Sequence, residues 1–305
     1  MPRVVRFERF GGPEVLRVVE EDRPEPGEGA VLVRVRAAGL NPVESGIRGG
    51  FLEGPYPTTF PSKQGRDVAG VVEAAGPGAA GFAPGDEVLG WTDERGTHAD
   101  YAVVPAGNLA YRPAGVPWEV AGALYTAGAT AWAALRAVAA GAGDTLVVAN
   151  AAGGVGSIAV QLARHAGASV IGLAGEAHHD WLRDRGVLPV PYGDAVLDRV
   201  RAAAGEKADA FVDAFGSGYV ELALDLGVQP DRISTVIDFA AAARHGVKTA
   251  GSKDASRPEV LAELAGLVAE GRLEVPVRPY PLDRVAEAFA ELERRHTLGK
   301  LVIVP

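Results

Sequence analysis

The segment from Val147 to Gly156 contains the residue types that a dinucleotide-binding turn needs. An apolar run ending at Ala149 leads into a turn of small residues, and a helical pattern follows. In a dinucleotide fold, glycines let the backbone approach the pyrophosphate, while the helix N-terminus supplies amide donors and a partial positive charge. The usual spacing is Gly-x-Gly-x-x-Gly, whose first position falls here on Ala151 or Ala152. We therefore expect the diphosphate to be held by Ala152, Gly153, Gly154, Val155 and Gly156. The alternative is a glycine turn of an unrelated α/β protein.

The end of the next expected strand, near Gly175, indicates which dinucleotide binds. Enzymes that use NAD generally place an acid there to hold the ribose 2′-hydroxyl, but here the first acid is Glu176, slightly later. His178 and His179 follow, and small residues next to cationic groups suit a 2′-phosphate. The sequence thus predicts NADPH as the cofactor, with Gly175, His178 and His179 at the phosphate. The alternatives are that the two histidines form a solvated helix start, or that Glu176 reaches the ribose.

Two aspartates, Asp213 and Asp238, each end a further expected strand. Ligands of parallel sheets bind beyond the carboxyl ends of the strands, so Phe215, Asp238 and Phe239 are expected to line the ribose and nicotinamide. Helix N-capping is an equally good interpretation of either aspartate.

The elements that must position these residues change in character along the chain. Residues 1–120 consist mostly of alternating or β-branched runs separated by glycine and proline turns, which predicts a β-rich unit. After an alanine-rich helix at 120–140, strands and helices alternate, which predicts a parallel sheet with crossover helices. The expected strands of this half are 145–149, 169–173, 210–213 and 232–238. The expected helices are 155–166, 179–185, 196–204 and 219–226. A helix at 258–271, a strand at 273–277, a helix at 282–295 and a strand at 300–304 close the chain.

The composition excludes several classes of function. The chain has 305 residues with a formal net charge of −9, which argues against a nucleic-acid partner because a polyanion needs a basic face. There are no cysteines, so disulfides, thiolate zinc ligands and a cysteine nucleophile are excluded. No apolar run reaches the length of a membrane span, and the N-terminus has no signal-peptide core, so we expect a cytoplasmic protein.

The sequence resembles the medium-chain dehydrogenase/reductases, and among them the zinc-free quinone oxidoreductases, over nearly its whole length. The matching segments are Arg36 to Glu44, Gln64 to Val72, Gly81 to Val88, Ala151 to Gly156 with Gln161 to Ala163, and Gly299 to Val302. The resemblance implies a GroES-like catalytic domain (1–120), a Rossmann cofactor domain (121–270) and a C-terminal return to the first domain (271–305). It also implies a homodimer, for which we expect the sheet edge near Thr249 to Gly251 to form the contact.

Several site residues follow from this resemblance. Asn41 is expected near the nicotinamide and substrate, Thr130 near the diphosphate or ribose, and Tyr192 and Arg295 near the adenosine phosphate. Zinc-dependent relatives have a His-Glu pair where this chain has Gln64-Gly65-Arg66-Asp67, which predicts that no metal is needed. Aromatic residues that line the quinone pocket in some relatives are replaced here by Gly46 and Leu52. The resemblance therefore does not determine which acceptor the protein reduces.

The reaction predicted is zinc-independent hydride transfer from NADPH to a quinone or an α,β-unsaturated carbonyl. Conjugated acceptors need little activation, because the added electrons delocalise, whereas a simple carbonyl benefits from a metal Lewis acid. Asn41 is the expected polar contact, with a turn asparagine as the alternative, and Tyr56 or Tyr125 are candidate proton donors that would otherwise be packing residues. There are two competing hypotheses. One is an enoyl-type reductase. The other is an NADPH-binding protein with little turnover that acts as a redox sensor or interaction protein.

Overall fold

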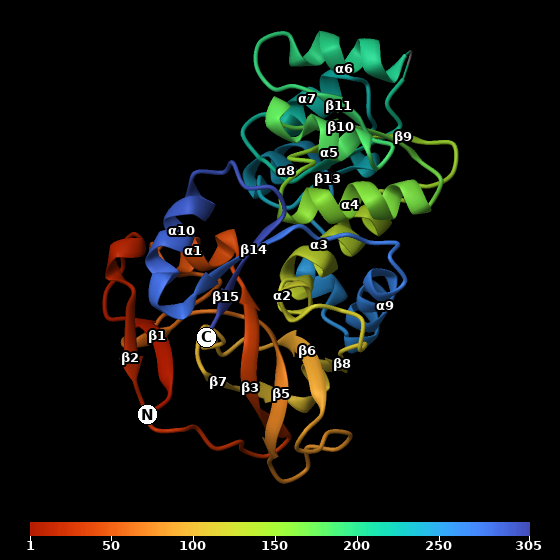
Figure 1. The fold of residues 1–305 in the computed structure, drawn as a ribbon. Coiled ribbons are helices and arrows are strands. Elements are labelled where there is room, and N and C mark those ends of the chain that lie inside the picture. Colours follow the sequence, from red (N-terminus) through yellow and green to blue (C-terminus); the bar gives the residue numbers. More distant parts are fainter. Residues whose placement is uncertain (206) are drawn as a thin grey trace. The chain divides into compact units, whose positions relative to one another are not determined.

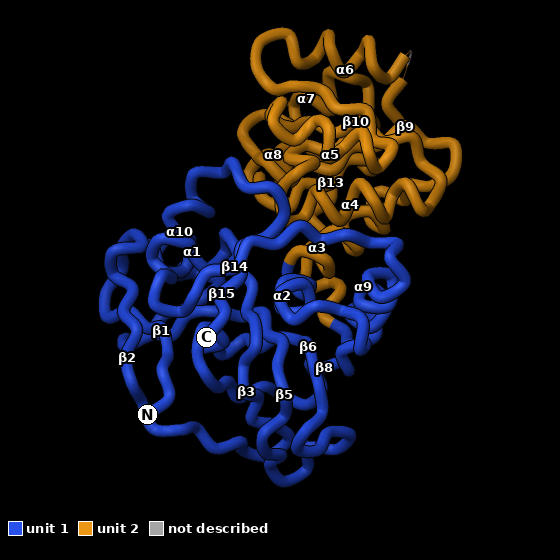
Figure 2. The backbone as a smooth tube through the Cα atoms, in the orientation of Figure 1, with its two compact units in different colours: residues 1–126, 257–305 blue, residues 127–256 orange. Residues whose placement is uncertain are grey.

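The computed structural model describes residues 1–205 and 207–305. The chain forms two compact units, which Figure 2 distinguishes by colour. Unit 1 consists of residues 1–126 and 257–305, and unit 2 consists of residues 127–256. The chain therefore leaves unit 1, builds unit 2, and returns to unit 1 for its last 49 residues, 257–305.

Unit 2 is a parallel sheet flanked by helices (Figure 1). Its strands, in spatial order, are β11 (Leu188–Val190), β10 (Ser169–Leu173), β9 (Thr145–Ala149), β12 (Ala210–Asp213) and β13 (Ile233–Thr235). All neighbouring pairs are parallel, and the order reverses direction between β9 and β12. This is the doubly wound order of a Rossmann fold, whose ligands bind at the carboxyl ends of the strands beside that reversal. The predicted α/β fold with a Rossmann parallel sheet is confirmed.

The helices of unit 2 connect these strands. They are α4 (Gly154–His165), α5 (His179–Arg183), α6 (Val196–Ala204), α7 (Tyr219–Asp225) and α8 (Phe239–His245), and α3 (Leu124–Ala137) runs from unit 1 into unit 2. Apolar residues of the strands and helices, among them Val147, Phe211, Val220 and Ile233, form the core. Burial of this apolar surface is the main force that holds the layers together.

Unit 1 is built on a larger, mostly antiparallel sheet. Its main path runs β14 (Val277–Pro281), β15 (Lys300–Val304), β3 (Ala30–Gly39), β5 (Asp67–Ala75), β6 (Glu87–Trp91) and β8 (Leu109–Tyr111), and β7 (Tyr101–Pro105) pairs with β3. A smaller sheet contains β2 (Arg17–Glu20), β1 (Arg3–Phe7) and β4 (Ser62–Lys63). The helices are α1 (Pro42–Arg48), α2 (Trp118–Ala121), α9 (Pro258–Ala269) and α10 (Val285–Glu293).

The single helix expected at 120–140 is two helices, α2 and α3, and three further expected elements differ from the structure. The strand expected at 273–277 is β14, Val277–Pro281, which lies at a sheet edge where Pro279 and Pro281 are tolerated although they weaken the strand pattern. The strand expected at 232–238 ends at Thr235, because Asp238 caps an alanine-rich helix instead. Residues 249–251, the expected dimer edge, are not in a strand, since the sheet ends at β13 with one bridge to Lys248.

Candidate functional site

The glycine turn of unit 2 lies where the fold predicts a dinucleotide site. It connects β9 to the N-terminus of α4 at the carboxyl end of the sheet. Asn150 takes the left-handed conformation, with φ of 58°, and its side-chain amide donates to the Ala214 carbonyl oxygen over 3.1 Å. A Cβ on Gly156 would lie 2.0 Å from the Asn150 carbonyl oxygen, so only glycine allows the first turn of α4 to pack this closely on the loop.

The predicted diphosphate residues are therefore brought together in one short loop. Ala152 and Gly153 are buried in the turn, and Gly154 and Val155 are half-buried at the start of α4. Gly153 is the extended N-cap, with the Asn150 side chain beneath it: a Cβ there would meet that amide at 2.5 Å. Gly153 and Gly156 thus let the loop pack tightly on Asn150, in the strand–turn–helix arrangement that binds a pyrophosphate in dinucleotide folds.

The end of β10 is open where a ribose phosphate would bind. Gly175 is exposed, and a Cβ placed there would meet nothing within 4 Å. His178 is half-buried, whereas His179 is buried with its Nε2 3.1 Å from the Ala174 carbonyl oxygen. Of the histidine pair, His178 is thus the more accessible to a ligand.

Tyr192 belongs to an aromatic cluster with Phe215 and Tyr219 beside these strand ends. Its ring centroid lies 5.3 Å from that of Phe215, and its hydroxyl donates to the Leu173 carbonyl oxygen over 2.9 Å. Burial raises the pKa of Tyr192, partly offset by a hydrogen bond to the Asn150 backbone. The phenol therefore stays neutral and supports the ends of β9 and β10.

The two aspartates at strand ends have structural partners. Asp213 is fully buried and accepts from the amides of Phe215 and Gly216 and from the Thr235 hydroxyl. Asp238 caps α8 by accepting from the Ala241 amide over 2.9 Å, while the next residue, Phe239, is 60% exposed. The capping interpretation holds for Asp238, whereas Asp213 shapes the loop after β12.

The remaining predicted cofactor residues lie elsewhere on the chain. Thr130 is buried in α3 of unit 2, and Arg295 is an exposed residue of unit 1, just after α10, with φ of 58°. The predicted set therefore draws on both units.

In unit 1, Asn41 lies within a buried polar cluster. Asn41, Glu44, Asp67 and Lys300 are each at most 4% exposed. The Lys300 ammonium donates to the Asn41 side-chain oxygen and to the Leu40 carbonyl oxygen, the latter over 2.7 Å, and lies 4.0 Å from the Asp67 carboxylate. The Glu44 carboxylate accepts from the Asn41 backbone amide over 3.0 Å. Asp67 also accepts from the backbone amide and hydroxyl of Thr126.

Burial controls the protonation of this cluster. Loss of solvation and the neighbouring Asp67 charge raise the pKa of Glu44 to about 8. Burial also lowers the pKa of Lys300, an effect that Asp67 and Glu44 oppose. Nearby, His98 is buried with Nε2 on the Gly39 carbonyl, and burial lowers its pKa to about 4. Glu44 is therefore an acid that burial keeps protonated at neutral pH.

The two candidate tyrosines lie beside Arg66, which follows the Gln64-Gly65 turn. Tyr125 is 2% exposed and stacks on Trp91 with ring centroids 4.4 Å apart. Tyr56 is half-buried, with the Arg66 guanidinium 5.7 Å from its ring centroid, and Arg66 pairs with Asp93. Gly46 and Leu52 are in contact, because a Cβ on Gly46 would lie 2.7 Å from Leu52. A larger residue at position 46 would displace Leu52.

Sequence reasoning missed the partners of Asn41. Lys300 was part of a matched strand motif, and Glu44 part of another, but neither was expected to meet Asn41. The available signal was a lysine at the start of the apolar strand Lys300–Val304. A charged residue at a buried strand position usually has a partner, but the sequence does not say which.

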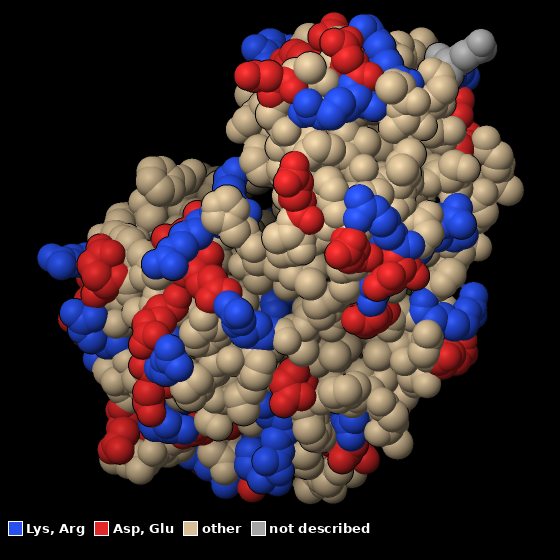
Figure 3. Space-filling view, turned by 45° about the horizontal axis from the view of Figure 1, so that its top comes forward, with Lys and Arg blue, Asp and Glu red and all other residues tan. Residues whose placement is uncertain are grey.

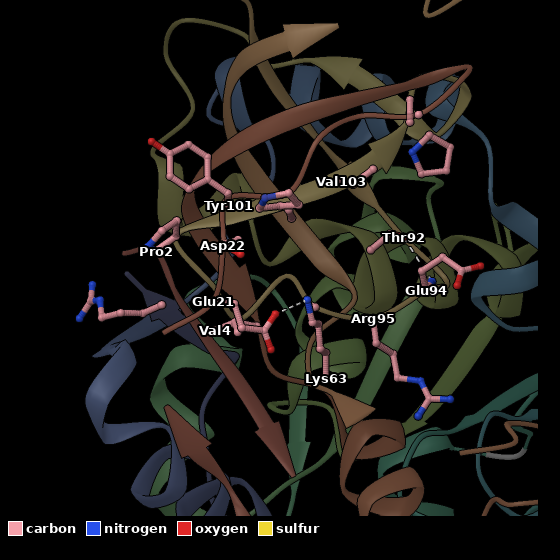
Figure 4. A pocket seen from close by; sticks show the side chains of 17 residues that line it. Pro2, Val4, Glu21, Asp22, Lys63, Thr92, Glu94, Arg95, Tyr101 and Val103 are labelled. Atoms are coloured by element: carbon pink, nitrogen blue, oxygen red, sulfur yellow. Dashed lines mark hydrogen bonds and ion pairs between the residues drawn. The ribbon is translucent and has the colours of Figure 1, made fainter. Parts of the chain in front are cut away.

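Unit 1 also has a surface hollow of about 330 Å³ that none of the predicted site residues lines (Figure 4). Two of its charged side chains have partners: Lys63 pairs with Glu21 over 2.7 Å, and Arg95 donates to the Pro57 carbonyl oxygen. On the face shown in Figure 3, acidic and basic side chains are interspersed.

Within residues 1–205 and 207–305, no group of three or more histidine, cysteine or acidic side chains is placed to hold a metal ion. In that same part of the chain, no helix has the length and apolar character needed to cross a bilayer.

The fold and the glycine turn define a dehydrogenase-type oxidoreductase, and comparisons with known proteins identify its family. Residues 27–114 match the alcohol dehydrogenase GroES-like domain, and residues 190–303 match the zinc-binding dehydrogenase family. The chain is 31% identical to a quinone oxidoreductase of Pseudomonas aeruginosa, with 100% of both chains covered. It is also 31% identical to the chloroplastic NADPH-dependent alkenal/one oxidoreductase of Arabidopsis thaliana, covering 98% of this chain and 78% of that one.

A solved structure supports the same assignment. The crystal structure of Escherichia coli quinone oxidoreductase complexed with NADPH matches with a TM-score of 0.86 and 26% identity, covering 100% of both chains. The polyketide synthase GfsB of Streptomyces halstedii is 35% identical over 295 residues, but this chain spans only 5% of that protein. The chain belongs to the quinone oxidoreductase group of the medium-chain dehydrogenase/reductase family, and it is an oxidoreductase. The predicted family and its GroES-like and Rossmann parts are confirmed.

Proposed function

We propose that this protein transfers a hydride from NADPH to a quinone or an α,β-unsaturated carbonyl without a metal. The observation that carries the proposal is the buried amide of Asn41. Its Oδ1 accepts from Lys300, while its Nδ2 is buried without a hydrogen-bond partner. A neutral donor held in this way suits the carbonyl oxygen of a conjugated acceptor, on which negative charge develops during reduction.

The glycine turn fits the cofactor. Residues Ala152 to Gly156 would hold the diphosphate, because they form the small-residue turn between β9 and the N-terminus of α4 at the carboxyl end of the sheet. The open end of β10 at Gly175, with His178 close by, would accommodate a 2′-phosphate, and Tyr192, Arg295 and Thr130 are the further candidates. The related Escherichia coli enzyme was crystallised with NADPH, which supports this choice. When bound, the cofactor supplies the hydride.

The residues of the chain orient the acceptor and handle its charge and proton. Asn41 donates to the acceptor oxygen. A proton comes from Tyr56, Tyr125 or solvent. Tyr56 is half-buried and can exchange with solvent, whereas Tyr125 is almost fully buried against Trp91. Gly46 and Leu52 form an apolar contact that would shape the acceptor end.

The test is a panel of quinones, enones and saturated aldehydes, each mixed with NADPH while the absorbance of the reduced nicotinamide is followed. Turnover with quinones and enones is the expected result. Turnover with enones alone would favour an enoyl-type reductase. Tight NADPH binding without turnover on any acceptor would favour a redox sensor or interaction protein. Turnover limited to aldehydes or alcohols would contradict the proposal.

We also infer a cytoplasmic homodimer, for which family membership is the support. Unit 2 offers a sheet edge at β13, and unpaired edges are usually covered or paired. Sedimentation equilibrium at micromolar concentration should give twice the chain mass of 31.5 kDa. A mass of one chain would rule the dimer out.

A further inference from the structure

Lys300 is a buried ammonium whose position needs an explanation. It begins β15, is 4% exposed, and precedes four apolar residues. Burying an ammonium costs several kcal/mol unless it is paired and hydrogen-bonded. Replacing it with an apolar residue would remove that cost, yet the chain places a lysine between the Leu40 carbonyl, the Asn41 side chain and Asp67.

The effect of Lys300 on Asn41 is visible at the start of α1. Asn41 is the N-cap of this helix, and an N-cap asparagine normally uses its side-chain oxygen to accept from the first helical amides. Asn41 makes no such bond, because its Oδ1 accepts from Lys300 instead. The backbone amide of Asn41 is held separately, by the Glu44 carboxylate. Asn41 is thus held at its backbone amide by Glu44 and at its side-chain oxygen by Lys300.

The lysine also determines which way the Asn41 amide faces. An ammonium has donors and no acceptor, so the group that faces it must be the amide oxygen. The Nδ2 group is then turned away from Lys300, where it is buried and has no partner. A buried donor without an acceptor is costly, so such a group calls for an explanation, of which a partner supplied by a bound molecule is one.

The groups around Lys300 hold it in place. Asp67 is fully buried, lies 4.0 Å from the ammonium, and is itself fixed by Thr126. Glu44, His98 and Arg66 are the other titratable groups that act on this cluster. Lys300 is therefore held between Asp67, the Leu40 carbonyl oxygen and the Asn41 side chain.

We propose that Lys300 is a positioning residue that fixes the orientation of the Asn41 amide, so that Nδ2 donates to an oxygen atom of the bound acceptor. Lys300 itself does not touch the acceptor. The identity of the acceptor rests on the proposed function, but the orientation of the amide does not. If Lys300 acts only through Asn41, its removal has no further effect once the Asn41 amide is absent.

A double-mutant cycle tests this dependence. Lys300→Met should lower kcat/KM for a quinone by about 10- to 100-fold, as expected when a positioning contact is lost. The dissociation constant for NADPH should change far less. In an Asn41→Ala background, Lys300→Met should cause no further loss. Lys63→Met, which removes a half-exposed lysine of the same unit, is the control and should leave kcat/KM unchanged. A loss in the double variant equal to the product of the two single losses overturns the proposal.

Nuclear magnetic resonance gives a readout that does not depend on turnover. The chain has three asparagines, Asn41, Asn108 and Asn150, so selective ¹⁵N-asparagine labelling yields three side-chain amide pairs. Lys300→Met should shift the Asn41 pair, assigned with Asn41→Asp, and leave the Asn108 and Asn150 pairs in place. An Asn41 pair that does not move overturns the proposal. If the wild type reduces no acceptor, the proposed function fails, while this measurement still decides the role of Lys300.

A further variant covers the case in which Lys300→Met does not fold. Removing the ammonium leaves Asp67 as an uncompensated buried charge, which is strongly destabilising. Asp67→Ser with Lys300→Met removes both groups and adds no asparagine, and its reference is the wild type. The same shift of the Asn41 pair between these two proteins supports the proposal, and its absence refutes it.

Discussion

The Asn150 side-chain amide donates to the Ala214 carbonyl oxygen over 3.1 Å, which joins the ends of β9 and β12. These are the two strands between which the strand order of unit 2 reverses direction. Ligands of doubly wound sheets bind at this reversal. Asn150 therefore holds together the two strand ends that border the candidate cofactor site. Its left-handed backbone, with φ of 58°, also turns the chain into the glycine loop.

Asn150→Ala should therefore weaken both stability and cofactor binding. The variant loses one hydrogen bond and places alanine in a left-handed conformation, each at about 1 kcal/mol. We expect the free energy of unfolding to fall by about 1–2 kcal/mol, and the NADPH dissociation constant to rise by about tenfold, which corresponds to 1.4 kcal/mol. Urea denaturation and fluorescence titration measure the two effects.

Asn108 offers a matched control for this variant. Its side-chain amide also donates to a backbone carbonyl, that of Trp91, over 3.2 Å, but in unit 1. Asn108→Ala should lower stability without changing NADPH affinity. Equal effects of both variants on the dissociation constant would show that Asn150 has no special role at the cofactor.

Gly156 should not tolerate even a methyl group. A Cβ at this position would lie 2.0 Å from the Asn150 carbonyl oxygen and 2.8 Å from the Ala151 Cα, both of them backbone atoms. Gly156→Ala must push α4 away from the loop, and we expect a loss of about 1–3 kcal/mol in the free energy of unfolding together with weaker NADPH binding.

Gly266→Ala makes the same chemical change where there is space. Gly266 lies inside α9, and a Cβ there would meet nothing within 4 Å. Alanine favours a helix over glycine, so this variant should gain about 0.5–1 kcal/mol. A Gly156→Ala protein as stable as Gly266→Ala would contradict the close approach seen in the structure.

Local sequence patterns predicted most of unit 2 because its elements are short and regular. The strands at 145–149, 169–173 and 210–213 have the predicted bounds, and so does the helix at 196–204. Each of these strands is an apolar run that ends at a turn or loop. The short strand β11, Leu188–Val190, was not predicted, because three residues that include a proline have no visible period.

The polar cluster of unit 1 could not be predicted, because its members are far apart in the chain. Asn41 and Lys300 are 259 positions apart and meet only because β15 pairs with β3, placing the end of the chain beside its first long strand. Burial then changes the chemistry of Glu44, which a sequence shows only as an ordinary acid. Pairing between distant strands is set by tertiary packing, which local patterns do not report.

The buried Glu44 should make stability fall as the pH rises. Its pKa is raised to about 8 in the folded protein against an ordinary value of 4.5, so the folded state binds more protons between these values. Its stabilising contribution is complete below pH 4.5 and is lost as the pH rises through about 8. Within that window we expect a loss of about 1.4 kcal/mol per pH unit from this group.

Glu44→Gln isolates this effect from other titrations. His98 acts in the opposite sense, because burial lowers its pKa from 6.5 to about 4. Its contribution to the free energy of unfolding is lost as the pH falls from 6.5 to about 4. The difference between wild type and Glu44→Gln in urea denaturation cancels such shared terms. Glutamine resembles the protonated acid, so the two proteins should be similarly stable near pH 4, below the ordinary value of 4.5, and the variant more stable near pH 8. A difference that is constant with pH would show that Glu44 is ionised throughout.

On the proposed function, Gly175→Asp should shift the cofactor preference from NADPH towards NADH. The residue is exposed at the end of β10, its φ is −65°, and a side chain there meets nothing within 4 Å, so the change should not disturb the fold. A carboxylate at this strand end suits a ribose 2′-hydroxyl and repels a 2′-phosphate. We expect the NADPH dissociation constant to rise by about 10- to 100-fold, and that of NADH to stay the same or fall. Gly115→Asp, in an exposed and open loop of unit 1, adds the same charge and should affect neither cofactor. If Gly175→Asp weakens NADH as much as NADPH, then the end of β10 does not contact the ribose, and the argument for NADPH from this strand end is wrong.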